Sequence, residues 1–234
     1  MSAGTDKHRW VFDLIHPDSA RRAAAIGRQR DLMSKSQEAI QWQNDVWQRA
    51  GRELMPSDPA LQAEMDQARA AQWAAWESTL LGPVYAFCSA RWSGGPEAHS
   101  RYAPYAVLFL QWETRYPDEW HHAAIGGWGT KKEVLRRFIA AGPTPDTQAD
   151  LLELLTAAIY REHRCEDSRY AALARQLDGP SLRCCLASAQ QDHDGLVRLR
   201  AGYMQWVVDN ATAPVTAASW RRWLAGNSVA SRSR

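Results

Sequence analysis

The feature that most constrains this chain is a long apolar stripe between Asp18 and about Met55. Apolar side chains recur there in two adjacent columns: Ile26, Met33, Ile40, Trp47 and Leu54 in the first, and Ala25, Leu32, Ala39 and Val46 in the second. Neighbouring columns at a seven-residue spacing share one face of an α-helix. Pro17 precedes the stretch, and Asp18 or Ser19 can cap its first N–H groups. The pattern predicts one long amphipathic helix.

A second amphipathic helix is predicted directly after a short turn, MPSDP at 55–59. Ser57 or Asp58 can cap this helix, and Pro59 suits its first turn because the missing N–H costs nothing there. Helical spacing continues through Leu61, Met65, Ala68, Gln72, Ala75, Trp76 and Leu80, and Gly82-Pro83 marks the end. Because a short turn joins two long helices, the sequence predicts an antiparallel α-hairpin.

The rest of the chain is predicted to form shorter helices separated by glycine and proline. Residues 84–92 fit a short helix or an extended segment, and the apolar run at 104–116 is typical of a buried core helix. Thr130 and Glu133 have the spacing of a capping box, which predicts a helix start at Thr130. Further helices are expected from 144 and at 167–177, 181–191, 195–209 and 216–225.

These elements predict an all-α fold, a helical bundle or array led by the long antiparallel α-hairpin. One domain over residues 1–234 is expected, because the apolar stripe of the hairpin needs something to bury against. An alternative boundary falls near 93–96, with the long hairpin in 1–92 and a compact helical array in 97–234.

Composition places the chain among cytoplasmic globular proteins. Hydrophobic residues make up 45% and charged residues 23%, which argues against disorder. The first ten residues hold no apolar core of a signal peptide, and no run of about 18 apolar residues predicts a membrane span. The four cysteines, Cys88, Cys165, Cys184 and Cys185, show neither a disulfide framework nor a CxxC metal pair, so we expect reduced thiols.

Familiar catalytic motifs are absent, and we expect no metal, no cofactor and no catalytic residue. The chain has no G-x-S-x-G, no P-loop and no G-x-G-x-x-G. Glu119 and His122 stand at i, i+3 and could join His163 around a metal, but the second E-x-x-H of a di-metal bundle is missing. The spacing of Arg115 and His121 resembles the R-x(4–6)-H motif of HEPN-type ribonucleases, which implies an acid–base histidine and a phosphate-stabilising arginine.

Basic side chains gather toward the C-terminus, where residues 195–234 hold six basic groups and one acidic group, a net +5. Trp220 and Trp223 share a helix face and can pack inward, which leaves the intervening arginines outward. A second basic helix start lies at 130–137, and a helix N-terminus suits a phosphate. The candidate nucleic-acid contacts are Lys131, Lys132, Arg136, Arg137, Arg198, Arg200, Arg221 and Arg222.

Tryptophan gives the second binding signal, since the chain has 12 tryptophans. Trp42 and Trp73 fall off the best stripes of the two long helices. Exposed tryptophan is common in interface hot spots, so both residues are candidate protein-binding residues.

Residues 151–177 resemble the signature helix of a bacterial domain of unknown function. The signature has leucines, then Arg-x-x-Arg, an aromatic residue, and an acidic residue before glycine. Arg161 and Arg164 match the arginines, whereas Cys165 stands at the aromatic position and Ser168 at the glycine. The resemblance covers about a tenth of the chain and implies no activity.

Taken together, these patterns favour a non-catalytic binding subunit over an enzyme. The first expectation is an adaptor, immunity or assembly protein that contacts a protein partner or a second copy of itself. The alternatives are a nucleic-acid-binding subunit that uses the basic residues named above, and a helical metal-dependent hydrolase or ribonuclease at Arg115 and His121.

Overall fold

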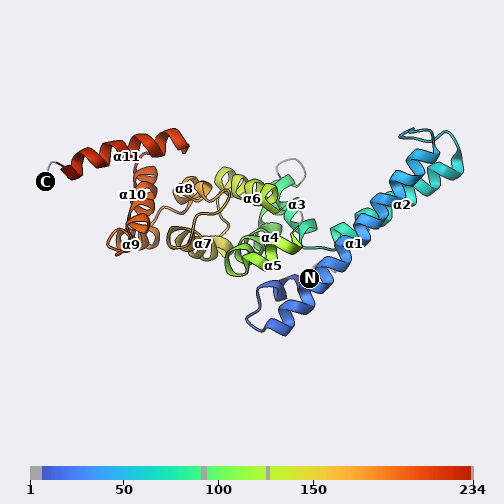
Figure 1. Ribbon diagram of the computed structural model, residues 1–234, viewed down its shortest axis with the longest axis horizontal. Helices are drawn as coiled ribbons and strands as arrows, with labels where there is room; N and C mark the ends of the chain where they lie inside the picture. Colours follow the sequence, from blue (N-terminus) through green and yellow to red (C-terminus); the bar gives the residue numbers. More distant parts are fainter. Residues whose placement is uncertain (1–6, 91–93, 125–126, 233–234) are drawn as a thin grey trace. The chain divides into compact units, whose positions relative to one another are not determined.

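The computed structural model describes residues 7–90, 94–124 and 127–232, with side chains up to Gly226 (Figure 1). Within these ranges the chain forms helices and no strand, which confirms the all-α class. The helices are η1 (Arg9–Ile15), α1 (Ser19–Arg49), α2 (Pro59–Glu77), α3 (Leu81–Ser89), α4 (Gly95–Arg115), α5 (Pro117–Ala123), α6 (Gly127–Ala141), η2 (Pro145–Thr147), α7 (Gln148–Tyr160), α8 (Ser168–Leu173), η3 (Ala174–Leu177), α9 (Pro180–Ala189), α10 (Gly195–Asp209) and α11 (Ala217–Arg232). The predicted loop at 93–96, the glycine break at 126–129 and the C-terminal tail lie partly outside the described residues.

The chain divides into two compact units, each built from two stretches of sequence. Unit 1 contains Met1–Ser89 and Gln111–Ile125, and unit 2 contains Ala90–Leu110 and Gly126–Arg234. Helix α4 contributes residues to both. The first division falls close to the alternative boundary near 93–96, but the chain returns to unit 1 at Gln111. No helix among the described residues is both long and apolar enough to cross a membrane.

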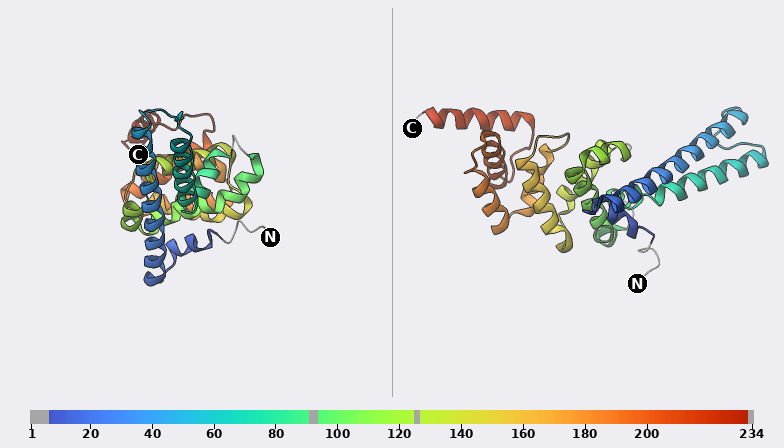
Figure 2. Two further views of the ribbon diagram at one scale, coloured as in Figure 1. Left: turned by 90° about the vertical axis from the view of Figure 1, so that its right-hand side faces the viewer. Right: turned by 60° about the horizontal axis from the view of Figure 1, so that its bottom comes forward.

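Unit 1 is led by α1 and α2, which lie side by side and run in opposite directions (Figure 2). The 31 residues of α1 span about 46 Å at the usual helical rise. Each long helix begins at an aspartate cap: Asp18 Oδ1 accepts from the Ala20 N–H, and Asp58 Oδ1 accepts from the Ala60 N–H, both at 2.8 Å. The aspartate is therefore the cap at both starts, rather than the neighbouring serine.

Along the outer part of α1, the column of smaller side chains is more deeply buried than the column of large ones. Ser36, Ala39 and Val46 are buried, whereas Ile40 is 40% exposed. Leu54 is 74% exposed and lies beyond the end of α1 at Arg49, so the predicted extension of that helix to about Met55 is wrong. Small residues let two helices approach closely, and the bulky column is then displaced to one side of the hairpin.

The turn from α2 into α3 depends on a close backbone approach at Gly82. A Cβ at this position would lie 2.3 Å from the carbonyl oxygen of Glu77. Helix α2 ends at Glu77, and Gly82 and Pro83 lie in the first turn of α3 instead of ending α2 as predicted. Residues 84–89, which fitted either a helix or an extended segment, are helical.

Two helix starts predicted from the sequence of unit 2 are wrong. Helix α4 begins at Gly95 and carries Pro104 inside it, nine residues earlier than the predicted start at Pro104. Helix α6 begins at Gly127, so Thr130 is not its N-cap and the predicted capping box does not stand at the helix terminus. The core of this unit includes the fully buried side chains Phe138, Leu155 and Val207.

Candidate protein-binding surface and neighbouring sites

The two sides of the α1–α2 hairpin, here called the arm, differ in chemistry. On one side Trp42 Nε1 donates to Glu64 Oε1 at 2.9 Å, and Arg49 Nη2 donates to the same oxygen at 2.5 Å. A helix turns about 100° per residue, so Ile40 points away from Trp42 and Trp73 points away from Glu64. Ile40 and Trp73 therefore lie on the opposite side, which we call the aromatic side of the arm.

The aromatic side is only partly covered. Trp73 is 52% exposed and its ring centroid lies 5.1 Å from that of Trp76. Trp76 meets Tyr85 of α3 edge-on at 5.3 Å, and Tyr85 is 55% exposed. These rings form an apolar surface that continues from the arm onto α3 within unit 1, and Ile40 is exposed on the same side of the arm.

The two tryptophans predicted to bind protein thus have different surroundings. Trp73 is exposed on the aromatic side, as its off-stripe position predicts. Trp42 is half-buried and its indole N–H bonds Glu64, a bond that also holds the pKa of the Glu64 carboxyl below its usual value. Trp42 therefore helps to hold the arm together. The helical period alone does not distinguish these outcomes, because it does not show which polar group of the neighbouring helix meets each indole.

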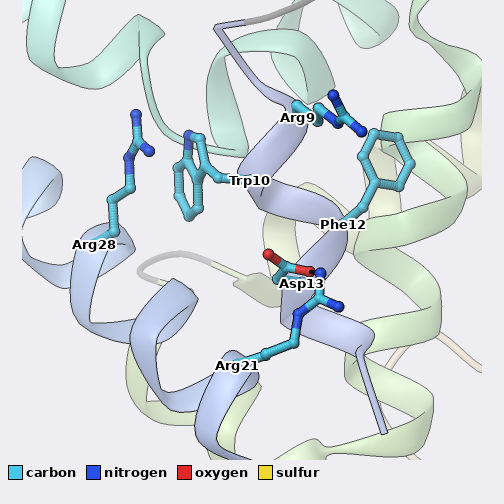
Figure 3. Close-up of a pocket in the computed structure, with 6 residues that line it drawn as sticks. All are labelled: Arg9, Trp10, Phe12, Asp13, Arg21 and Arg28. Atoms are coloured by element: carbon cyan, nitrogen blue, oxygen red, sulfur yellow. Dashed lines mark hydrogen bonds and ion pairs between the residues drawn. The ribbon is translucent and has the colours of Figure 1, made fainter. Parts of the chain in front are cut away.

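A second notable surface in unit 1 combines arginine with aromatic rings around η1 and the start of α1 (Figure 3). It is an open depression of about 550 Å³ lined by Arg9, Trp10, Phe12, Asp13, Arg21 and Arg28. Arg21 Nη2 donates to Asp13 Oδ1 at 2.6 Å, which neutralises the one carboxylate of the set. The Arg28 guanidinium lies 4.9 Å from the Trp10 ring centroid. The depression is therefore positively charged, and the sequence patterns did not single it out.

A buried ion cluster in unit 2 overlaps the predicted nucleic-acid residues. Lys131 is completely buried, and its Nζ lies 2.8 Å from Asp167 Oδ1. Arg161 Nη1 donates to Asp167 Oδ2 at 2.7 Å and its Nη2 to Oδ1 at 2.9 Å. The backbone N–H of Arg164 also donates to Asp167, at 2.8 Å. Lys131 is thus an interior cation with a fixed partner and does not present its charge to a nucleic acid.

The remaining predicted nucleic-acid residues do not share one environment. Lys132 is exposed, Arg136 is exposed and ion-paired with Glu133 at 3.3 Å, and Arg137 is half-buried. Arg198 Nη1 donates to two backbone carbonyls, those of Asp192 and His193.

In the first half of α11 the tryptophans pack inward and the arginines lie on the surface, as the sequence predicts. Trp220 and Trp223 pack on Tyr203, with ring centroids 4.9 and 5.7 Å away, whereas Arg221 and Arg222 are exposed. Arg200 is half-buried and is described below with the pocket that it lines.

The residues considered for metal or ribonuclease chemistry form no evident centre. Glu119 is ion-paired with Arg22 at 3.2 Å, and His122 Nδ1 lies 2.6 Å from the Asp118 carbonyl oxygen. Among the described residues, no group of three or more His, Cys, Asp and Glu side chains could hold a metal ion. Arg115 at the end of α4 and His121 in α5 are both exposed.

Comparison with known proteins finds no matching family model, no similar curated protein and no similar solved structure.

Proposed function

We propose that this chain is a protein-binding subunit that contacts another protein through the aromatic side of its arm. The observation that supports this proposal is the exposed run of Ile40, Trp73 and Tyr85 beside a helix pair whose own contact uses small residues. Aromatic side chains supply much of the binding free energy at protein interfaces. A two-helix arm also offers a rigid face on which a partner helix can lie.

The arm alone has no other evident use for these side chains. Leaving Trp73 half in water costs free energy, because a buried indole would remove a large apolar area from solvent. The other side of the arm is closed by hydrogen bonds to Glu64. The partner is therefore expected to bury the aromatic side, with Trp73 near the centre of the contact.

Site-specific photo-crosslinking tests this proposal. A photoreactive amino acid at position 73 should crosslink the full chain in cells to one defined protein, or to a second copy of itself. The matched control is position 71, an exposed alanine on the same helix that faces the Glu64 side. The crosslinked protein is then purified, and Trp73→Ala should weaken its binding by about tenfold or more. Equal crosslinking from 71 and 73, or an affinity that Trp73→Ala leaves unchanged, would overturn the proposal.

A second candidate function is binding of a nucleic acid, and the depression around Trp10 favours it. Arg9, Arg21 and Arg28 offer charge to phosphates, and aromatic rings can stack on bases. Fluorescence anisotropy with a labelled single strand should then show binding that weakens as salt rises. Arg28→Glu should reduce it, whereas Arg30→Glu, an equal charge change on another face of α1, should reduce it much less. Equal effects of the two variants would remove the depression as the binding site.

A further inference from the structure

Unit 2 contains a pocket of about 470 Å³ walled by α8, α10 and the start of α11. Its lining is mainly apolar, with Ala171, Leu199, Met204 and Trp220 among the residues that form it. The volume falls in the range of about 300–1,000 Å³ that is typical of small-molecule sites. An α-helix of a partner protein is about 10 Å wide and would need a groove longer than this pocket. The volume of the pocket therefore favours a small ligand.

Ring packing and a hydrogen bond between α10 and α11 fix the side of the pocket that α11 forms. The Tyr203 ring meets Trp220 edge-on at 4.9 Å, and the Tyr203 hydroxyl lies 2.8 Å from Ser219 Oγ. Tyr203 and Ser219 are both buried. The pocket is therefore formed by packed side chains on both helices.

One end of the pocket is polar and positively charged. Arg200 Nη1 donates to the carbonyl oxygens of Ile159 at 3.0 Å and Arg161 at 2.5 Å, which fixes the guanidinium at the end of α7. In the part of the chain that the structure describes, Nε and Nη2 of Arg200 bond no protein atom. His163 also lines this end and is exposed.

The carboxylate at this end does not cancel that charge. Asp167 lines the pocket, but its two carboxylate oxygens bind Lys131 and Arg161. Among the described residues Arg200 bonds only backbone carbonyls, so its positive charge is not paired with Asp167. A ligand group that meets this end is therefore favoured if it is an anion, and the Nε–Nη2 edge of a guanidinium matches the two oxygens of a carboxylate.

We propose that this pocket binds a small amphipathic carboxylate. The apolar body of the ligand lies along Leu199, Met204 and Trp220, and its carboxylate accepts hydrogen bonds from Arg200. This site lies in unit 2 and does not depend on the protein-binding surface of unit 1.

Isothermal titration of the full chain with decanoate tests the proposal, with decylamine as the charge-reversed probe. Decanoate should bind saturably at one site per chain, and decylamine should bind at least about tenfold more weakly, because the charged end accepts only an anion. Ala217→Trp places a bulky ring at the pocket rim from an exposed position and should weaken decanoate binding about tenfold or more. Ala218→Trp is the matched control, since Ala218 is equally an exposed alanine of α11 but does not line the pocket, and it should leave binding unchanged.

Arg200→Lys tests the head group separately, because it keeps the charge and loses the planar fork. It should weaken decanoate binding and leave the binding of decylamine unchanged, with the thermal midpoint recorded for every variant. Absence of saturable binding, equal affinity for the two probes, or equal effects of Ala217→Trp and Ala218→Trp would overturn the proposal. Concentration-dependent dimerisation that Ala217→Trp abolishes would also overturn it, because the pocket would then receive a second copy of the chain.

Discussion

At the scale of single residues, the buried cluster around Asp167 is a point of unit 2 where a substitution should lower stability strongly. Asp167 accepts from two cationic side chains, and one of them, Lys131, is fully buried. Asp167→Asn keeps the volume but removes the negative charge that both cations contact. Removing one partner of a buried pair typically costs about 3–5 kcal/mol, so the free energy of unfolding should fall by that order. Urea denaturation followed by circular dichroism measures the change.

Glu133→Gln provides the control for this prediction. Glu133 pairs with Arg136 on the surface of α6, where both side chains are about half exposed. Exposed pairs contribute about 0–1 kcal/mol, so this variant should unfold close to the parent. If Asp167→Asn unfolds at the same urea concentration as Glu133→Gln, the cluster has no structural role.

His99 makes a residue-scale prediction about pH. The residue is buried, and this burial lowers the pKa of its imidazole, while the hydrogen bond to the Gly142 carbonyl acts in the opposite direction. The folded state therefore favours the neutral ring. Its stabilising contribution is full above the ordinary pKa of 6.5 and is lost as pH falls through the lowered folded value.

Urea titrations between pH 7.5 and 5 check this expectation. The free energy of unfolding should fall as the solution is acidified, and His99→Gln should show a smaller fall because glutamine does not titrate. His8 is shifted in the same direction by burial and contributes to both proteins alike. An identical pH dependence for parent and variant would contradict the assignment.

At the scale of elements, the contact between α1 and α2 depends on small side chains. Ala68 is fully buried between the two helices. Ala68→Leu should force them apart and lower the free energy of unfolding by about 1–3 kcal/mol. Ala70→Leu is the matched control, because Ala70 is exposed on the same helix and its replacement should change stability by less than about 0.5 kcal/mol. Equal stabilities of the two variants would mean that the helices do not pack through Ala68.

Helix periodicity and capping chemistry predict much of this fold because both are local. Asp18 and Asp58 cap the long helices, as the sequence allows. The predictions of helix bounds and buried faces are wrong where contacts between helices, and not local sequence, determine the structure. Two apolar columns of α1 are equally good by period, and the column with small residues faces α2 because it permits closer packing. Pro104 lies inside α4, whereas the local sequence pattern predicts that a helix starts at this proline.

The candidate binding residues are less predictable from the sequence, again for a tertiary reason. Lys131 looks like a surface cation in sequence, and only the fold brings Asp167 to it across 36 residues. The exposure of Trp73 agrees with its off-stripe position, and its role in binding a protein stays a prediction. The depression around Trp10 and the pocket beside Arg200 carry no sequence motif, since each is assembled from side chains on more than one element.

At the scale of the whole molecule, the two units should differ in local stability. The outer half of the arm buries only the face between α1 and α2, whereas α6 and α7 of unit 2 contain many fully buried side chains, such as Phe138 and Leu155. Regions with few buried apolar contacts open at a lower free energy. Amides around residues 37–68 should therefore exchange with deuterium earlier than those of α6 and α7.

Hydrogen exchange monitored by mass spectrometry of the isolated chain measures this order directly. The comparison is internal, since both regions belong to one sample at one pH. If the arm exchanges as slowly as α6 and α7, its aromatic side is already covered. Dilution then distinguishes the causes: exchange in the arm that speeds up on dilution identifies a second copy as the cover, whereas unchanged slow exchange contradicts the expectation of an open arm. Addition of a true partner protein should slow exchange around Trp73 and leave α7 unchanged.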